Sequence, residues 1–385
     1  MVEFYTEEVE KESIVGNVYR GKVLNVLNGM EAAFVDIGEE KNAFLYLKDS
    51  LSKEQLYDKG KYAISDVLKG GEDVIVQVVK ESLGTKGPKI TTHISIPGKF
   101  IVLTPHSQNI NVSRKITDGE EINRLKNIGN EIKESNIGMI FRTNAENIGE
   151  DILSGEYNSL LSIYRKIEKE RTFLPTPKLI YKELDLAYQI VRDTFNDRNF
   201  EIIVNDKDVY NRIISYEESF SYGLKGKIIL NKNFSIDNNT NIQMDIKEAL
   251  ERRVNLKSYI VIDETEALTA IDVNTGKFIG SHTLDDTVLK TNLEAAVEIA
   301  RQIRLRDIGG IIIVDFIDMK INEHISHVLS KMSEEFNKDR NKPHIIDVTK
   351  LFLVEITRKK IRPTLDRKTS IVCPHCNGRG RITNI

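Results

Sequence analysis

The chain has little of several residue types whose abundance would mark a particular class of protein. It contains no tryptophan and only two cysteines among 385 residues. Two cysteines are too few for a disulfide framework, so they fit a protein of the reducing cytosol. A net charge of only −3 excludes both a polybasic chain and a disordered acidic one. Any surface that binds nucleic acid must therefore be local.

Long hydrophobic runs are also missing. No stretch approaches the roughly 18 apolar residues that a membrane-spanning helix needs. The first residues, MVEFYTEEVEKES, are acidic and lack the apolar core of a signal peptide. The sequence therefore predicts a cytoplasmic protein without a membrane span, and its length suggests about two to four domains.

Residues 16–92 contain short β-branched and aromatic runs separated by turn signals such as NG and IGEEKN. About five short strands in such a segment are typical of a small barrel, and an OB-fold is the most economical prediction. Phe34 and Phe44 fall on candidate strands, with basic Arg20, Lys22 and Lys86 in the same segment. Rings stack on bases and cations meet phosphates. A barrel core also needs phenylalanine, so both interpretations stay open.

The middle of the chain mixes helical and extended patterns. The strand candidates KFIVLTP and IGMIFRT flank a polar helix candidate, and residues 155–171 place apolar side chains at helical spacing. A second helix candidate, LDLAYQIVRDTFN, precedes the strand candidates FEIIVND and GKIILNK. This region is predicted to be mixed α and β.

The last third has the clearest pattern. SYIVIDETEALTAIDVNTG predicts a hairpin, residues 284–306 a long helix with one apolar stripe including Leu289 and Leu293, and GGIIIVDFIDM a buried strand. A further helix (321–337), a strand at HIIDVT and a basic helix complete an α/β layer. Asp272 and Asn274 project to the same side of their strand because they are two residues apart.

An acid at the end of a run as apolar as GGIIIVD is costly to bury unless it is paired or binds a metal. If the two strands share a sheet, Asp272 and Asp315 could hold a hard cation, with Asn274 as a neutral oxygen ligand. Mg²⁺ favours such sites and can polarise a phosphodiester for attack by water. On spacing alone, it is equally consistent that Asp315 caps a turn and Asp272 pairs with an arginine.

Both cysteines lie in CPHCNGRGRI. Tetrahedral zinc takes four ligands, so Cys373 and Cys376 would form half a site, which the same pair from a second chain would complete. CPHC also resembles the active site of a thioredoxin-fold oxidase. That chemistry needs the first cysteine at a helix N-terminus within a βαβ unit, so we favour a zinc ion shared between two chains.

Three segments carry a resemblance to the RNase E/G family of bacterial endoribonucleases. VIDETEALTAIDVNTG, TNLEAAVEIARQIRLRDIGGIIIVDFIDM and CPHCNGRG occur in the family's order, and weaker similarity runs from Gly16 to the end. The resemblance implies hydrolysis of single-stranded, A/U-rich RNA, favouring 5′-monophosphorylated substrates, in rRNA and mRNA processing and decay. It implies Asp272 and Asp315 as Mg²⁺ ligands, with Asn274 assisting by hydrogen bonding.

The same resemblance implies RNA-contacting residues outside the catalytic centre. In an S1-like OB domain, Phe34, Phe44 and Lys86 match the positions that grip RNA. IFRTNAE resembles the family's pocket for a 5′-monophosphate, so Arg142 and Thr143 are expected to bind the terminal phosphate. An arginine fork with a hydroxyl suits a group that carries more charge than an internal phosphate.

The family's layout implies an α/β multidomain fold. An RNase H-like domain (1–15 and 177–250) would receive an S1-like OB-fold (16–92) and a 5′ sensor region (93–176) as insertions. A DNase I-like catalytic domain (251–371) and a zinc link (372–385) would follow. The first strand of the RNase H-like domain is expected to be missing. The chain also stops where many relatives continue into a small domain that pairs dimers into tetramers, so a zinc-linked homodimer is expected rather than a tetramer.

Two other functions compete with RNA cleavage. A scaffold derived from the same family would bind RNA without cutting it, although the presence of Asp272, Asn274 and Asp315 argues against this. A thiol oxidoreductase would lose activity in Cys373→Ser and be indifferent to Mg²⁺. The sequence does not predict the RNA targets, the detailed cleavage preference or any other protein partners.

Overall fold

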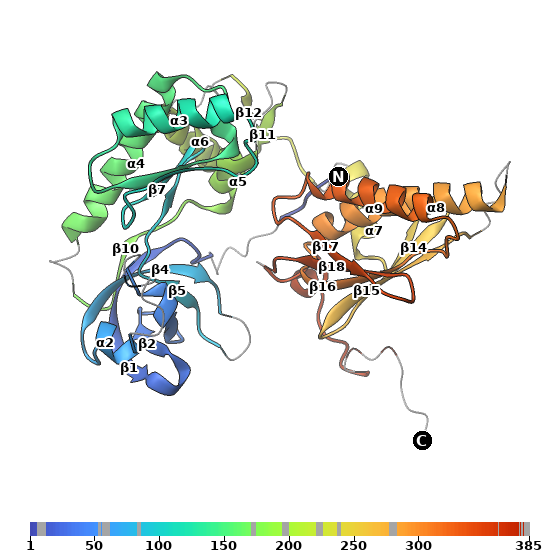
Figure 1. The fold of residues 1–385 in the computed structure, drawn as a ribbon, viewed down its shortest axis with the longest axis horizontal. Helices are drawn as coiled ribbons and strands as arrows, with labels where there is room; N and C mark the ends of the chain where they lie inside the picture. The colour runs from blue at the N-terminus through green and yellow to red at the C-terminus, as the bar shows by residue number, and fades with distance from the viewer. Residues whose placement is uncertain are drawn as a thin grey trace. The chain divides into compact units, whose positions relative to one another are not determined.

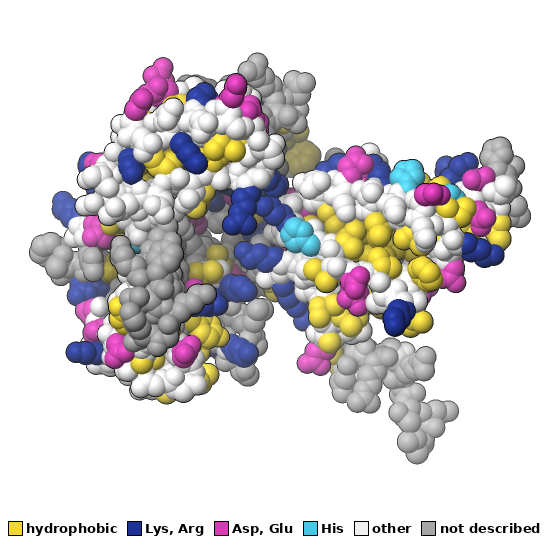
Figure 2. Space-filling view, in the orientation of Figure 1, with side chains coloured by type: hydrophobic (Ala, Val, Ile, Leu, Met, Phe, Trp, Pro, Cys, Tyr) yellow, Lys and Arg dark blue, Asp and Glu magenta, His cyan; other side chains and the backbone are white. Residues whose placement is uncertain are grey.

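The computed structural model describes most of the chain. The described residues are 1–5, 13–52, 55, 62–82, 86–170, 175–194, 200–220, 226–236, 240–276, 283–360, 362–376, 378 and 380. The chain divides into two compact units, Glu7–Phe234 and Met1–Thr6 with Ser235–Ile385 (Figure 1). Among the described helices, none has the length and apolar character needed to cross a bilayer. Acidic and basic side chains are interspersed over the face in view (Figure 2).

A closed barrel of five strands begins the larger unit. Its strands are β1 (Val18–Leu27), β2 (Ala32–Asp36), β3 (Ala43–Tyr46), β4 (Asp73–Lys80) and β5 (Lys89–Thr91). They pair in the order β1-β2-β3-β5-β4, and β4 pairs back to β1 to close the barrel. Alternate residues of β2 and β3, such as Val35 and Leu45, fill the barrel core because side chains alternate across a strand. The OB-like barrel predicted from the sequence is confirmed.

Short elements complete the barrel. The 3-10 turns η1 (Asn28–Met30) and η2 (Leu47–Asp49) and the helix α2 (Ile64–Val67) connect its strands. Strand β10 (Lys178–Tyr181) joins the open side of β1 in antiparallel pairing. A segment far along the chain is thus part of the same sheet.

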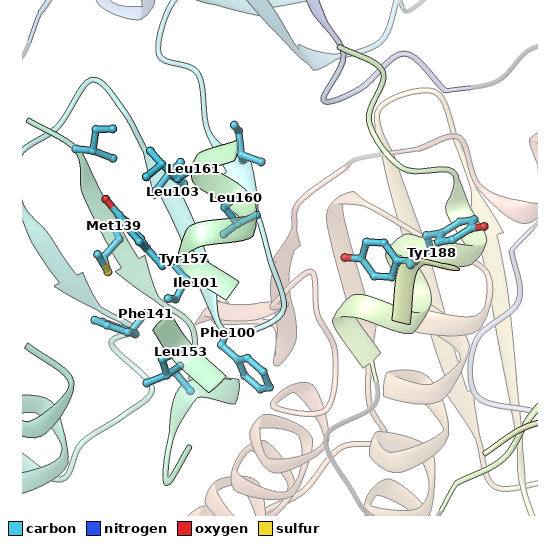
Figure 3. Close-up of a cluster of buried hydrophobic side chains, with 14 of the residues drawn as sticks. Phe100, Ile101, Leu103, Met139, Phe141, Leu153, Tyr157, Leu160, Leu161 and Tyr188 are labelled. Atoms are coloured by element: carbon cyan, nitrogen blue, oxygen red, sulfur yellow. The ribbon is translucent and has the colours of Figure 1, made fainter. Parts of the chain in front are cut away.

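A four-stranded sheet forms the second part of this unit. Its strands, in the order β6-β7-β9-β8, are β6 (Ile96–Pro97), β7 (Ile101–Thr104), β9 (Gly138–Phe141) and β8 (Ile110–Val112). The helices α3 (Gly119–Ile132) and α4 (Glu150–Glu170) pack on it, and η3 (Thr143–Ala145) follows β9. Leu153 and Tyr157 of α4, one turn apart, pack with Leu103, Met139 and Phe141 of the sheet (Figure 3).

The rest of the larger unit shares this core. It consists of α5 (Leu186–Thr194), β11 (Ile202–Val204), α6 (Lys207–Phe220) and β12 (Ile228–Leu230). Strands β11 and β12 pair in parallel, as expected for strands joined by a crossover helix. Tyr188 of α5 meets Tyr216 of α6 edge to face, with ring centroids 5.6 Å apart.

The smaller unit is a six-stranded sheet covered by helices. The strands, in the order β13-β14-β15-β16-β18-β17, are β13 (Arg253–Asn255), β14 (Tyr259–Glu264), β15 (Leu268–Asn274), β16 (Gly310–Asp315), β18 (Leu353–Arg358) and β17 (His344–Val348). The helices are α7 (Thr240–Leu250), α8 (Leu284–Leu305), α9 (Asn322–Phe336) and α10 (Leu365–Thr369). Ile299 and Ile303 of α8 pack with Ile312 and Val314 of β16. The opposite face of the sheet carries exposed side chains such as Ile311.

One strand was not predicted. Strand β18 follows HIIDVT and inserts between β16 and β17, and the basic helix expected after HIIDVT is the short α10. The last residue of β18, Arg358, is buried because Asp307 and Asp339 each accept a hydrogen bond from it at 2.8 Å.

Candidate functional sites

Asp272 and Asp315 stand side by side on the open face of the six-stranded sheet. They are register partners on the parallel strands β15 and β16. In each strand, the neighbours of the acid on the chain are buried in the core and the acid itself is exposed. Register partners project to the same face, so both carboxylates point away from α8 and toward solvent. The two strands share a sheet and place Asp272 opposite Asp315; β16 ends at its acid, whereas β15 continues two residues further to Asn274.

Polar contacts orient this acid pair. Asn274 donates from Nδ2 to Oδ2 of Asp272 at 2.6 Å. Behind β16, fully buried Asn292 of α8 donates to the carbonyl of Ile317 at 2.8 Å and accepts from its N–H at 3.2 Å. The segment that leaves Asp315 is therefore fixed to the helix. No pattern in the sequence indicated Asn292, because an asparagine within a helical pattern is usually exposed.

The surroundings of the pair disfavour the ionised form of Asp315. Burial raises the pKa of Asp315, and the negative charges of Asp272 and Asp318 raise it further. No described lysine or arginine is among the groups that shift this pKa. Within the described ranges, no group of three or more His, Cys, Asp or Glu side chains is preformed to hold a metal. The pair is thus two like charges in adjacent strands that lack a neutralising cation from the described protein.

A row of aromatic rings lies on the outside of the barrel. Phe34 and Phe44 are register partners, with ring centroids 5.3 Å apart, and Phe44 meets Tyr46 at 4.6 Å. Both phenylalanines are half-buried and lie outside the barrel's core cluster. Lys89 reaches the ring of Tyr46 at 5.3 Å. Lys86 is exposed, three residues before Lys89.

Tyr46 and Lys89 were not singled out from the sequence. Tyr46 is two residues after Phe44 on the same strand, so alternation alone would have placed both rings on one face. Lys89 required the parallel pairing of β3 with β5, in which it is the register partner of Phe44.

Arg142 and Thr143 lie where β9 ends. Arg142 donates from Nη1 to the Gly98 carbonyl and to Oδ1 of Asp193, both at 2.6 Å. Oγ1 of Thr143 lies 3.0 Å from Oγ of Ser113. The two predicted residues are therefore adjacent at a strand end. Asp193 was not predicted, since it lies 51 residues further along the chain on a helix.

Cys373 and Cys376 flank a turn at 374–376. Cys373 is exposed and Cys376 half-buried. Hydrogen bonds from the backbone of Cys376 and His375 lower the pKa of the Cys373 thiol, helped by the Cys376 side chain. The Gly380 N–H donates to Sγ of Cys376 at 3.3 Å. The donors at Cys373 favour its thiolate form, which is the form that binds metals.

Comparison with known proteins identifies the family. Residues 95–361 match the model of the Ribonuclease E/G family. The chain is 38% identical to Ribonuclease G of Haemophilus influenzae, and 37% identical to Ribonuclease G of Escherichia coli K12, in each case over 100% of this chain and 80% of the relative. It is 37% identical to Ribonuclease E of Nostoc sp., over 96% of this chain and 55% of that protein. The chain therefore belongs to the Ribonuclease E/G family, as its three sequence segments indicated.

Proposed function

We propose that the protein is a Mg²⁺-dependent endoribonuclease. It hydrolyses single-stranded, A/U-rich RNA, favours 5′-monophosphorylated substrates, and acts in rRNA and mRNA processing and decay. The observation that carries this proposal is the register pairing of Asp272 with Asp315 on an open sheet face, in a chain whose relatives are named ribonucleases.

The residues at the acid pair fit a magnesium ion. Mg²⁺ is commonly bound by one or two carboxylates, with waters and substrate phosphate oxygens as the other ligands. Asp272 and Asp315 would hold it, and their unbalanced negative charge provides the attraction. A bound Mg²⁺ polarises a phosphodiester and lowers the pKa of a coordinated water.

Asn274 has a separate task in this proposal. An asparagine amide has two N–H donors, and one of them bonds to Asp272. That bond holds the carboxylate in one orientation. The second N–H lies on the same face of the sheet and would donate to a phosphate oxygen of the RNA. Asn274 would therefore position both the metal ligand and the substrate.

Binding of the RNA chain is assigned to the outer face of the barrel. The rings of Phe34, Phe44 and Tyr46 lie in a row, and single-stranded bases stack on such rings without needing a particular sequence. Lys86 supplies a positive charge for a phosphate. Arg142 and Thr143 would bind the terminal 5′-phosphate, the arginine through its planar fork and the threonine through its hydroxyl.

Zinc is assigned to the two cysteines. Their hydrogen-bonded sulfurs fit a metal that prefers thiolates, and one CxxC pair supplies two of the four ligands. Two chains would then share one ion and form a homodimer.

The domain layout remains part of the proposal. It consists of an RNase H-like domain (1–15 and 177–250) with the barrel (16–92) and sensor region (93–176) inserted, a DNase I-like domain (251–371) and a zinc link (372–385). The closed five-stranded barrel supports its second component.

A cleavage assay tests the proposed function. A fluorescent, 5′-monophosphorylated, A/U-rich oligonucleotide is incubated with the protein, with Mg²⁺ or with EDTA. We expect internal cleavage only with Mg²⁺, and none by Asp315→Asn, which still binds the RNA. Asp263→Asn is the matched control, because Asp263 is on the neighbouring strand β14 but pairs with Arg252. Binding without cleavage by the wild-type protein would support a scaffold instead.

A further inference from the structure

Arg142 is held by two acceptors that bond to the same nitrogen. The Gly98 carbonyl and Asp193 Oδ1 both accept from Nη1 at 2.6 Å. A guanidinium has five N–H donors in a fixed plane, and Nη1 carries two of them. Among the described residues, these bonds use both donors of Nη1 and leave the edge formed by Nε and Nη2. That edge is the fork that binds a phosphate through two parallel hydrogen bonds.

Asp193 is itself fixed by a buried arginine. At the end of α5, Arg192 donates to Asp193 from Nε at 3.1 Å and from Nη2 at 3.3 Å. The side chain of Arg192 is only 6% exposed. Its Nη1 donates to Glu183 at 2.8 Å and to the Pro97 carbonyl at 3.1 Å. The Asp193 carboxylate that contacts Arg142 is therefore held in place by Arg192.

The other acceptor of Arg142 is equally rigid. The turn that carries the Gly98 carbonyl is held by Glu156 of α4, which is almost fully buried. Its carboxylate accepts the N–H groups of Lys99, Phe100 and Ile101 at 2.6, 2.9 and 2.7 Å. A Cβ at Gly98 would lie 2.6 Å from this carboxylate, so the turn needs glycine there. Both anchors of Arg142 are thus set by buried charged groups.

The contact with Asp193 also changes the charge that an approaching anion meets at Arg142. Burial alone would raise the pKa of Asp193, but Arg192 and Arg142 lower it overall, so the carboxylate is ionised at neutral pH. An anion that approaches Arg142 meets a cation already partly neutralised. An internal phosphodiester carries one negative charge, whereas a terminal monophosphate carries roughly 1.5 to 2 at pH 7. A partly neutralised arginine attracts every phosphate less than a lone arginine would, so discrimination between the two groups relies on how the fork of Arg142 is held.

We propose that Asp193 is a positioning residue that sets the selectivity of the 5′-phosphate pocket. It turns the Nε and Nη2 edge of Arg142 toward the ligand and holds this fork in the orientation that a terminal phosphate needs. This inference rests on the proposed binding of a 5′-monophosphate by Arg142 and Thr143.

Two substitutions separate geometry from charge. Asp193→Asn keeps an oxygen that can accept from Arg142 but removes the charge, and Asp193→Ala removes both. For each, kcat and KM are measured with Mg²⁺ on one oligonucleotide carrying either a 5′-monophosphate or a 5′-hydroxyl. In Asp193→Ala we expect KM for the monophosphorylated RNA to rise about tenfold, the loss expected for one charge-assisted hydrogen bond. In Asp193→Asn, which keeps the acceptor for Arg142, we expect the ratio of the two KM values to stay close to that of the wild-type protein.

Two controls show whether Asp193 acts through Arg142. The double variant Arg142→Ala with Asp193→Ala should discriminate between the two RNAs no less than Arg142→Ala alone, because Asp193 has nothing left to position. Glu134→Ala removes an exposed ion pair with Arg165 from the same part of the fold, and should leave the ratio of the two KM values unchanged.

The possible results separate failure of this inference from failure of the proposed function. Unchanged ratios in both Asp193 variants would overturn this inference and leave the proposed function intact. An equal loss of kcat on both RNAs would mean that Asp193 only supports the fold, and would also overturn it. Wild-type protein that cuts both RNAs equally would refute the 5′ pocket, and this inference with it. Wild-type protein that cuts neither would refute the proposed function itself.

Discussion

Replacing Asp315 with asparagine should abolish cleavage and also make the protein more stable. Asp315 and Asp272 are like charges at register positions of adjacent strands, and burial and Asp318 further disfavour the ionised form of Asp315. An asparagine of nearly the same shape removes one of these charges. Residues that serve a metal site commonly reduce the stability of the metal-free fold in this way.

The expected gain in stability of Asp315→Asn can be calculated from the spacing between the strands. Neighbouring strands are roughly 4.8 Å apart. Two unit charges at that distance repel by about 1 kcal/mol in water and by about 3.5 kcal/mol at an effective dielectric constant of about 20. Both acids are exposed, so solvent screening puts the expected gain near the lower value, about 1 kcal/mol. For a cooperative unit of this size, that gain raises Tm by about 2–4 °C.

The stability difference between the wild-type protein and Asp315→Asn should change with pH in a definite direction. The pKa of Asp315 is raised in the folded protein, so the folded state binds more protons than the unfolded state between the ordinary pKa and the raised one. Wild-type stability therefore receives a penalty that grows as pH rises through this interval and stays constant above it. The advantage of Asp315→Asn should appear at neutral pH and vanish below the ordinary pKa of aspartate.

Thermal unfolding measures the effect. Wild-type protein and Asp315→Asn are compared in EDTA at low salt, at neutral and acidic pH, and then with added Mg²⁺. Salt should reduce the difference. Mg²⁺ should stabilise the wild-type protein and have less effect on the variant. Asp263→Asn should not gain stability, because it loses the partner of Arg252. An Asp315→Asn protein that is less stable than wild type in EDTA would refute the like-charge reasoning.

Three further predictions concern other parts of the chain. Phe44→Ala should weaken binding of single-stranded RNA about tenfold, the loss expected for one stacked base, with fluorescence anisotropy as the assay; unchanged affinity would move the RNA surface elsewhere. In a denaturant titration, Glu156→Ala should lower the free energy of unfolding by about 3–5 kcal/mol, because three buried N–H groups lose their acceptor. Glu170→Ala, at the exposed end of the same helix, should lower it only slightly. Cys373→Ser should release zinc, and sedimentation should then show monomers. Metal analysis of the wild-type protein should find about one zinc ion per two chains. One zinc ion per chain would mean that a local group such as His375 completes the site.

Two simple rules made it possible to predict that the two acids lie on the same face of one sheet. Alternation along β15 and β16 gives the face on which each acid lies. The helix between the strands makes a parallel, adjacent pairing the expected topology. The structure adds what these rules leave out, namely the register that places Asp272 opposite Asp315 and the buried Asn292 that fixes the following turn.

The environment of Arg142 could not be predicted in the same way. Its strand and the adjacent threonine are visible in IFRTNAE, but its partner is on α5, whose pattern only indicates an amphipathic helix. The pairing depends on how that helix packs, which no local pattern specifies. The helix α8 shows a milder form of the same limit. Leu289 and Leu293 were expected in its buried stripe, yet Val288 and Ala295 are more deeply buried.

The charges on the open sheet face explain why binding and cleavage must rely on different residues. Besides Asp272 and Asp315, this face carries Glu355, the register partner of Ile313. The exposed Arg253 of this face, in the same row as the acid pair through Val261, balances only one of these charges. Such a face repels a polyanion unless a cation lies between them. In the proposed function, the RNA is held by the barrel rings, Lys86, Arg142 and Thr143. Loss of an acid should therefore lower kcat and leave affinity nearly unchanged, whereas loss of a barrel ring should lower affinity and leave the chemical step to the metal site.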